Sequence, residues 1–273
     1  MCLSRLSAVS LVRSGLPTLM VAAVLAGCAS GPTPDETANW SPNKLYTEAM
    51  DLRDNGSYEK AAKYFEKLEG RAAGTPLAQQ AELEKSYAYY KDGDQAQAMV
   101  AIDRFLKLHP ASPAADYALY LKGLVNFNDN LGMFSSISRQ DLSERDQKSA
   151  KVSFEAFREL VERFPDSKYA PDARLRMTYI VNSLAQSEVH VARYYYQHGA
   201  YVAAINRAQL ALSEYRGVPA AEEALYILYK SYDALNMKDL ADDSKRVLDK
   251  NYPNSEYLTR GFKAKDDPWW KMW

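Results

Sequence analysis

The feature that most constrains the fold of this chain is a repeated helical unit that begins near Pro42. Each unit spans about 34 to 37 residues and contains two amphipathic helices joined by a short turn. One such unit has too little apolar surface to fold alone, so consecutive units must stack and bury their apolar faces against each other. The sequence therefore predicts an all-α solenoid of about five helix-turn-helix repeats over residues 42–260.

The spacing of small and large residues in the second helix of each unit indicates the tetratricopeptide (TPR) type of repeat. A small residue lets two helices approach closely, and a large apolar residue about one turn later fills the groove between them. We assign this repeat packing to Ala61, Phe65, Ala98, Ile102, Phe105, Phe157, Ala204, Ala208, Ala241 and Leu248. Pro110, Pro165 and Pro253 are expected to end second helices, because proline cannot continue the helical hydrogen-bond pattern.

Two segments depart from the repeat pattern. Residues 128–147 form an insertion of about 20 residues between the two helices of the third unit, and long loops of this kind are often functional. A disordered insertion is the alternative. Residues 261–273 form a tail that contains Trp269, Trp270 and Trp273. This Trp-rich tail is expected either to cover the exposed end of the last helix pair or to contact a partner or a membrane surface.

The first 27 residues have the features of a lipoprotein signal peptide. Arg5 and Arg13 precede an apolar stretch, residues 16–26, that is too short to span a bilayer as a helix. The stretch ends in Leu25-Ala26-Gly27-Cys28, which resembles the lipobox of bacterial lipoproteins. We therefore expect cleavage before Cys28 and acylation of its thiol. The alternative is an ordinary secreted protein with a chance cysteine.

Lipid on Cys28 would hold the mature protein on a membrane, and no other cofactor is expected. Ala29 follows the cysteine, whereas aspartate at this position would resemble the signal for retention in the inner membrane. The expected location is therefore the periplasmic face of the outer membrane. Residues 28–41 have the composition of a loop and are expected to form a flexible tether to the repeats.

The composition argues against several classes of function. Lys and Arg (34 together) nearly balance Asp and Glu (35 together), which argues against nucleic acid as a partner. His109, His190 and His198 have no cluster of further ligands near them in the sequence, so we expect no metal site. The sequence has no glycine-rich phosphate loop and no Gly-x-Ser-x-Gly turn. We therefore expect a protein that binds other proteins, and not an enzyme.

The chain also carries motifs that helix packing does not require. Among them are Asp103-Arg104, Asn206-Arg207 and longer segments at residues 87–91, 164–169 and 191–203. These motifs resemble the BamD (ComL) family of lipoproteins, which belong to the outer-membrane β-barrel assembly machine. The similarity extends over nearly all of the mature chain, although residues 69–76 depart from an aromatic segment found in some members.

The resemblance implies a lipid-anchored scaffold of that machine. Family members are five-repeat solenoids that bind the POTRA domains of BamA, bind other assembly-machine lipoproteins and help to receive unfolded outer-membrane proteins. The family segment that faces BamA is similar to the stretch ending at Arg207, so Arg207, Asn206 and Tyr195 are the expected partner-binding residues. Arg207 lies beside the seam of Ala204 and Ala208, where it can pair with a partner carboxylate. Alternatively, it is a surface arginine that only covers its neighbours.

Two other functions fit parts of the sequence. A solenoid lipoprotein of pilus biogenesis or of the cell wall would share Cys28 and the repeats. It would not share the insertion. Nor would it share the one long helix, or the two collinear helices, that residues 167–197 are expected to form. A periplasmic hydrolase would need a cluster of polar catalytic groups, which no motif in the sequence provides.

Overall fold

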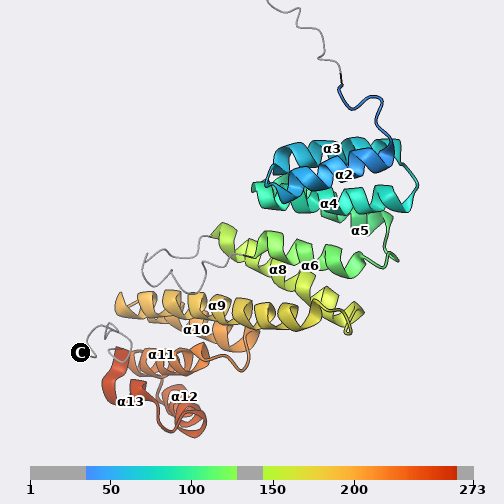
Figure 1. The fold of residues 1–273 in the computed structure, drawn as a ribbon. Helices are drawn as coiled ribbons and strands as arrows, with labels where there is room; N and C mark the ends of the chain where they lie inside the picture. Colours follow the sequence, from blue (N-terminus) through green and yellow to red (C-terminus); the bar gives the residue numbers. More distant parts are fainter. Residues whose placement is uncertain (1–34, 128–143, 263–273) are drawn as a thin grey trace, which may run out of the picture.

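The computed structural model describes residues 35–127 and 144–262 of the 273-residue chain. The signal peptide, the lipobox with Cys28, most of the insertion and the tryptophans of the tail lie outside the described residues. Within the described ranges all regular secondary structure is helical (Figure 1). The helices are α2 (Pro42–Asp54), α3 (Tyr58–Arg71), α4 (Pro76–Asp92), α5 (Gln95–Leu108), α6 (Ala115–Asn126), α8 (Glu144–Arg163), α9 (Ala170–Gln197), α10 (Tyr201–Glu214), α11 (Ala220–Ala234), α12 (Lys238–Asn251) and α13 (Glu256–Arg260).

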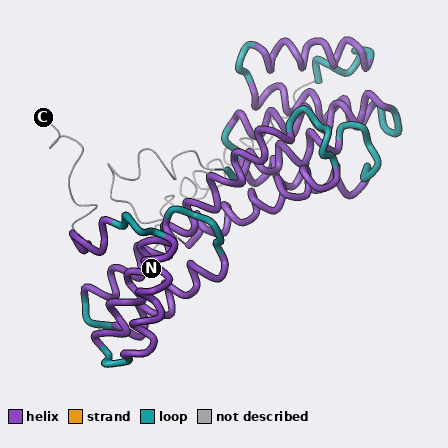
Figure 2. The backbone as a smooth tube through the Cα atoms, turned by 90° about the horizontal axis from the view of Figure 1, so that it is seen from below, coloured by secondary structure: helices purple, strands orange, loops and turns teal. Residues whose placement is uncertain are grey.

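The helices stack in chain order into an elongated solenoid (Figures 1 and 2). From α2 to α12, each helix packs on the next described helix in the chain. Five helix pairs follow one another, namely α2 with α3, α4 with α5, α6 with α8, α9 with α10 and α11 with α12. The short helix α13 packs on α11 at the C-terminal end. The prediction of an all-α TPR solenoid is confirmed.

Local sequence signals set the ends of the helices. Gly93 ends α4 in the left-handed region, at a φ of 85°, which glycine adopts without steric cost. The next residue, Asp94, caps α5, because its side chain accepts a hydrogen bond from the backbone N–H of Gln97 at 3.0 Å. Helices α5, α8 and α12 each end two residues before a proline, namely Pro110, Pro165 and Pro253.

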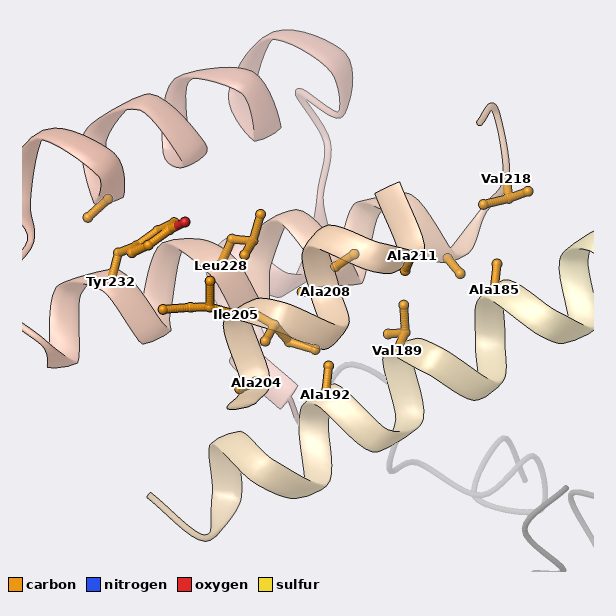
Figure 3. Packing of buried hydrophobic residues seen from close by; sticks show 14 residues of the cluster. Ala185, Val189, Ala192, Ala204, Ile205, Ala208, Ala211, Val218, Leu228 and Tyr232 are labelled. Atoms are coloured by element: carbon orange, nitrogen blue, oxygen red, sulfur yellow. The ribbon is translucent and has the colours of Figure 1, made fainter. Parts of the chain in front are cut away.

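Small residues at the helix seams define the core. The ten residues assigned to repeat packing are all buried, each with an exposed fraction of 2% or less. The seam between α9 and α10 consists largely of alanine, including Ala185, Ala192, Ala204 and Ala208 (Figure 3). Because these side chains are short, the two helices can approach closely along the seam. A larger side chain at one of these positions would displace its neighbours.

The third helix pair has a glycine at its seam. A Cβ atom on Gly123 of α6 would lie 2.3 Å from Cε1 of Phe157 on α8, a ring that is fully buried. The hydroxyl of Ser153 on α8 donates a hydrogen bond to the carbonyl oxygen of Gly123 at 2.8 Å, which holds the two helices at this separation. The contact between α6 and α8 therefore depends on glycine at position 123.

We predict that Gly123→Ala destabilises the protein by about 1 to 3 kcal/mol, because the Phe157 ring must move to admit a methyl group. Chemical unfolding followed by circular dichroism measures the change. Gly70→Ala is the matched control, since Gly70 lies in α3 with open space around it and alanine there should stabilise by up to about 1 kcal/mol. Equal stability of the two variants would contradict this account of the seam.

The structure corrects one boundary of the predicted insertion. Helix α8 begins at Glu144, so residues 144–147, which we assigned to the insertion, are helical. The side-chain amide of Gln147 donates a hydrogen bond to the hydroxyl of Ser187 on α9 at 3.2 Å, and this contact ties the start of α8 to the next helix pair. The long helix expected within residues 167–197 is α9, which has 28 residues.

The ends of the solenoid also differ from the prediction. Residues 35–41, expected to belong to a flexible tether, lie against α3, and Thr37 is only 1% exposed. The tail was expected to begin at residue 261, but the ring of Phe262 packs against the rings of Tyr196 and Tyr226. A few well-placed contacts are enough to hold such short segments on the surface, and composition alone does not reveal them.

Candidate partner-binding sites

The hairpin of α9 and α10 carries the three expected partner-binding residues. Arg207 Nη1 donates a hydrogen bond to Glu188 Oε2 at 2.9 Å and forms an ion pair with it. The Glu188 side chain is 10% exposed, whereas that of Arg207 is 44% exposed. Arg207 therefore lies at the surface, but a carboxylate of its own chain already balances its charge.

Asn206 and Tyr195 occupy different positions on the same hairpin. Asn206 is exposed. Tyr195 is partly buried against the core and packs edge-on against Tyr194, with ring centroids 6.0 Å apart. Because Tyr195 follows Glu188 by seven residues on α9, it lies on the same side of the helix, about 10 Å further along. The structure thus brings Arg207 to Glu188 and places Tyr195 about two turns beyond that pair.

Glu188 is the member of this site that the sequence analysis missed. It lies on α9 between Ala185 and Ala192, on a face that is otherwise apolar and buried. A carboxylate in such a position is uncommon and indicates a cationic partner on the adjacent helix. Identifying that partner as Arg207 requires the relative register of α9 and α10, which the periodicity of one helix does not contain.

We predict that Arg207→Glu lowers the melting temperature, because it places two carboxylates at one helix seam and leaves Glu188 without its counterion. Arg207→Gln should cost less, on the order of 1 kcal/mol, because it adds no second negative charge and the glutamine amide can still donate a hydrogen bond to Glu188. The double variant Glu188→Gln/Arg207→Glu removes the repulsion and should recover part of the loss. A double variant no more stable than Arg207→Glu would show that the two side chains do not interact.

Asp103 and Arg104 form another motif that repeat packing does not require. Their side chains connect neighbouring helix pairs. Asp103 of α5 accepts a hydrogen bond from Lys122 of α6 at 2.7 Å, and Arg104 of α5 donates one to Glu69 of α3 at 2.5 Å. The Arg104 guanidinium also lies 3.6 Å from the carboxylate of Glu82. Burial, and then the nearby Glu69 carboxylate, raises the pKa of Glu82. These two motif residues therefore serve the stacking of the solenoid.

A further charged cluster secures the C-terminal end. Arg193 of α9 forms an ion pair with Glu223 of α11, and the hydroxyl of Tyr257 on α13 donates a hydrogen bond to the other Glu223 oxygen at 2.8 Å. Glu223 is 1% exposed. Burial, together with the Glu223 carboxylate, raises the pKa of the Tyr257 hydroxyl. Glu223 therefore links three helices, α9, α11 and α13.

A second candidate site is a pocket of about 390 Å³ near the N-terminal end, among α2, α3, α4 and α6. Arg53 contacts Asp54 at 2.7 Å and also pairs with Glu84, so its charge is balanced. Within the part of the chain that the structure describes, the tyrosine hydroxyls of the pocket have no hydrogen-bond partner. The pocket is lined by Arg53, Asp54, Tyr58, Glu84, Tyr87 and Tyr117. Because the lining residues come from four helices, no sequence motif indicated this pocket.

In residues 35–127 and 144–262, no group of three or more His, Cys, Asp or Glu side chains is arranged to hold a metal ion. No helix in these ranges combines the length and the apolar character required to cross a membrane.

Comparison with known protein families shows to which family the chain belongs. The model of the YfiO family, described as outer membrane lipoprotein, matches residues 38–248, from just before α2 to the last turn of α12. The chain belongs to this family. The match includes the first four helix pairs, α11 and most of α12, and with them the N-terminal pocket.

Several relatives carry the name outer membrane protein assembly factor BamD. The protein of Neisseria meningitidis serogroup B is 44% identical over 262 residues, which cover 94% of this chain and 98% of the relative. That of Haemophilus influenzae is 34% identical over 236 residues, covering 86% and 89%. That of Vibrio cholerae is 32% identical over 236 residues, covering 86% and 97%. The resemblance to the BamD family that the motifs indicated is confirmed.

Proposed function

We propose that this protein is the lipid-anchored scaffold of an outer-membrane β-barrel assembly machine and helps to insert β-barrel proteins. The observation that carries the proposal is the five-pair solenoid in a chain of this outer-membrane lipoprotein family, whose relatives are named as assembly factors. A solenoid presents an extended surface on which several partners can bind at separate places. The protein therefore works by positioning its partners, with no cofactor apart from the lipid on Cys28.

Acylation of Cys28 would hold the solenoid on the periplasmic face of the outer membrane. The lipobox-like sequence before Cys28 and the Ala29 that follows it support this location. Membership of an outer-membrane lipoprotein family supports it as well. Several acyl chains anchor a protein durably, because each buried methylene contributes about 0.8 kcal/mol.

The partners are a BamA-like β-barrel protein with POTRA domains, other lipoproteins of the machine and unfolded outer-membrane proteins. The exposed guanidinium of Arg207 supports the first of these. The pocket near Arg53, whose tyrosine hydroxyls have no hydrogen-bond partner among the described residues, offers hydrogen bonds to an extended segment of an unfolded protein. The two sites lie on different helix pairs, so both kinds of partner can be bound together.

Arg207 can engage a partner carboxylate while it stays paired with Glu188. The hydrogen bond to Glu188 uses Nη1, and a guanidinium presents five N–H donors in a planar arrangement. The side chain is 44% exposed, so donors remain accessible. In this arrangement Glu188 orients the guanidinium, and Asn206 and Tyr195 contribute neighbouring surface on the same hairpin.

We predict that Arg207→Gln weakens binding to purified POTRA domains by about tenfold or more, because breaking a desolvated charge pair costs well over 1.4 kcal/mol. Isothermal titration calorimetry measures the affinity. The matched control is Arg158→Gln on α8, an arginine of similar exposure, 49%, that is paired with Glu155. The control should bind as the parent does. Parental affinity for a stably folded Arg207→Gln would remove this residue from the interface.

Co-purification from detergent-solubilised outer membranes tests the proposed function as a whole. A β-barrel protein with POTRA domains should be recovered together with this chain. Recovery of pilus or cell-wall proteins without such a barrel protein would instead favour the second kind of solenoid lipoprotein.

A further inference from the structure

Residues 35–41 are fastened to α3 by a set of contacts that we call the N-terminal clamp. The clamp consists of Asp35, Thr37 and Trp40, which precede α2, and of Lys67 and Arg71 on α3. Lys67 Nζ donates a hydrogen bond to Asp35 Oδ1 at 2.6 Å. Arg71 donates from Nη1 to the carbonyl oxygen of Thr37 at 2.6 Å, and from Nη2 to its hydroxyl at 3.1 Å. Two cations of one helix thus hold the segment.

Contacts inside the segment reinforce the clamp. Asp35 Oδ1 accepts hydrogen bonds from the Thr37 backbone N–H at 3.0 Å and from the Thr37 hydroxyl at 2.8 Å. The hydrogen bond from Lys67, followed by those from Thr37, lowers the pKa of Asp35 to about 2 from its ordinary 3.8. The carboxylate therefore stabilises the clamp at any pH above about 4, and its contribution is lost only as the pH falls through about 2. Trp40 packs edge-on against Tyr64, with ring centroids 5.8 Å apart.

The clamp shortens the chain between the proposed lipid anchor and the solenoid. Asp35 follows Cys28 by seven residues, a span of at most about 25 Å whatever path the chain takes. Without the clamp the first fixed residue would be Ser41, which caps α2 and follows Cys28 by thirteen residues. Thirteen residues reach up to about 47 Å. The clamp therefore reduces the reach of the anchor by about half.

We propose that the N-terminal clamp makes the α3 side of the first helix pair a membrane-apposed surface, held beside the phospholipid headgroups by the short chain from Cys28 to Asp35. This inference rests on the proposed acylation of Cys28. The other four helix pairs follow the first in chain order, so their distance from the bilayer is set by the placement of α3 (Figure 1).

The test uses the full acylated chain in phospholipid vesicles. Glu66→Cys places a reactive thiol on the exposed side of α3. In the processed chain this is the single free thiol, because Cys28 carries lipid and Cys2 has been removed with the signal peptide. A donor fluorophore on this thiol transfers energy to an acceptor attached to lipid headgroups. Transfer efficiency then reports how close α3 lies to the bilayer.

The clamp variant is Asp35→Ala combined with Arg71→Leu. Its matched control is Glu59→Ala combined with Lys63→Leu, which removes a 2.6 Å ion pair from the same helix and leaves the clamp intact. Transfer should be high in the parent and the control. It should fall in the clamp variant, because the root-mean-square length of the free chain rises from about 15 Å to about 20 Å.

Unchanged transfer in the clamp variant would overturn the proposal, and a glutamate-specific protease identifies the reason. Cleavage after Glu36 in the variant would show that the segment has been released from α3. Unchanged transfer would then mean that the longer free chain does not move α3 away from the bilayer. Resistance at Glu36 would mean that these contacts do not hold the clamp. A mature chain without acyl groups on Cys28, seen by mass spectrometry, would overturn the anchor itself and so differs from a failure of the clamp.

Discussion

The close approach of consecutive helices is the constraint on which the rest of this structure depends. Alanine residues at the seams, such as Ala98 and Ala208, and glycine at position 123 allow that approach. A solenoid has no contacts between its distant ends that could correct an error in one pair. Each seam therefore fixes the position of every later pair, and a side chain too large at one seam would shift the surfaces on which partners bind.

Ion pairs between helices distinguish seams whose apolar packing is otherwise similar. Glu69 pairs with Arg104, Glu188 with Arg207 and Glu223 with Arg193, in each case between different helices. In all three pairs the carboxylate is the more buried member and the guanidinium the more exposed one. A buried carboxylate without its cation is costly, so each pair favours one alignment of its helices. The same geometry leaves arginine donors at the surface, where partners can reach them.

Periodicity alone was sufficient to predict the helical stack, because repeat packing depends on the size and spacing of residues such as Ala98 and Phe105. The same periodicity could not predict Glu188 as the partner of Arg207, since that contact depends on the register between two helices. It also missed the clamp, because Asp35 meets Lys67 only after the chain folds back over 32 residues. The pocket near Arg53 could not be predicted for the same reason, because its lining residues come from four helices. Motif similarity pointed to the family without depending on any of these contacts.

Helix α9 belongs to more than one part of the stack. Its 28 residues span about 42 Å. Ile180 in its first half lies in one apolar cluster with Phe157 of α8, while Val189 in its second half packs with α10 and α11. One continuous helix therefore contacts α8, α10 and α11, which belong to the third, fourth and fifth helix pairs. A displacement of α9 would alter the packing surfaces of all three pairs at once.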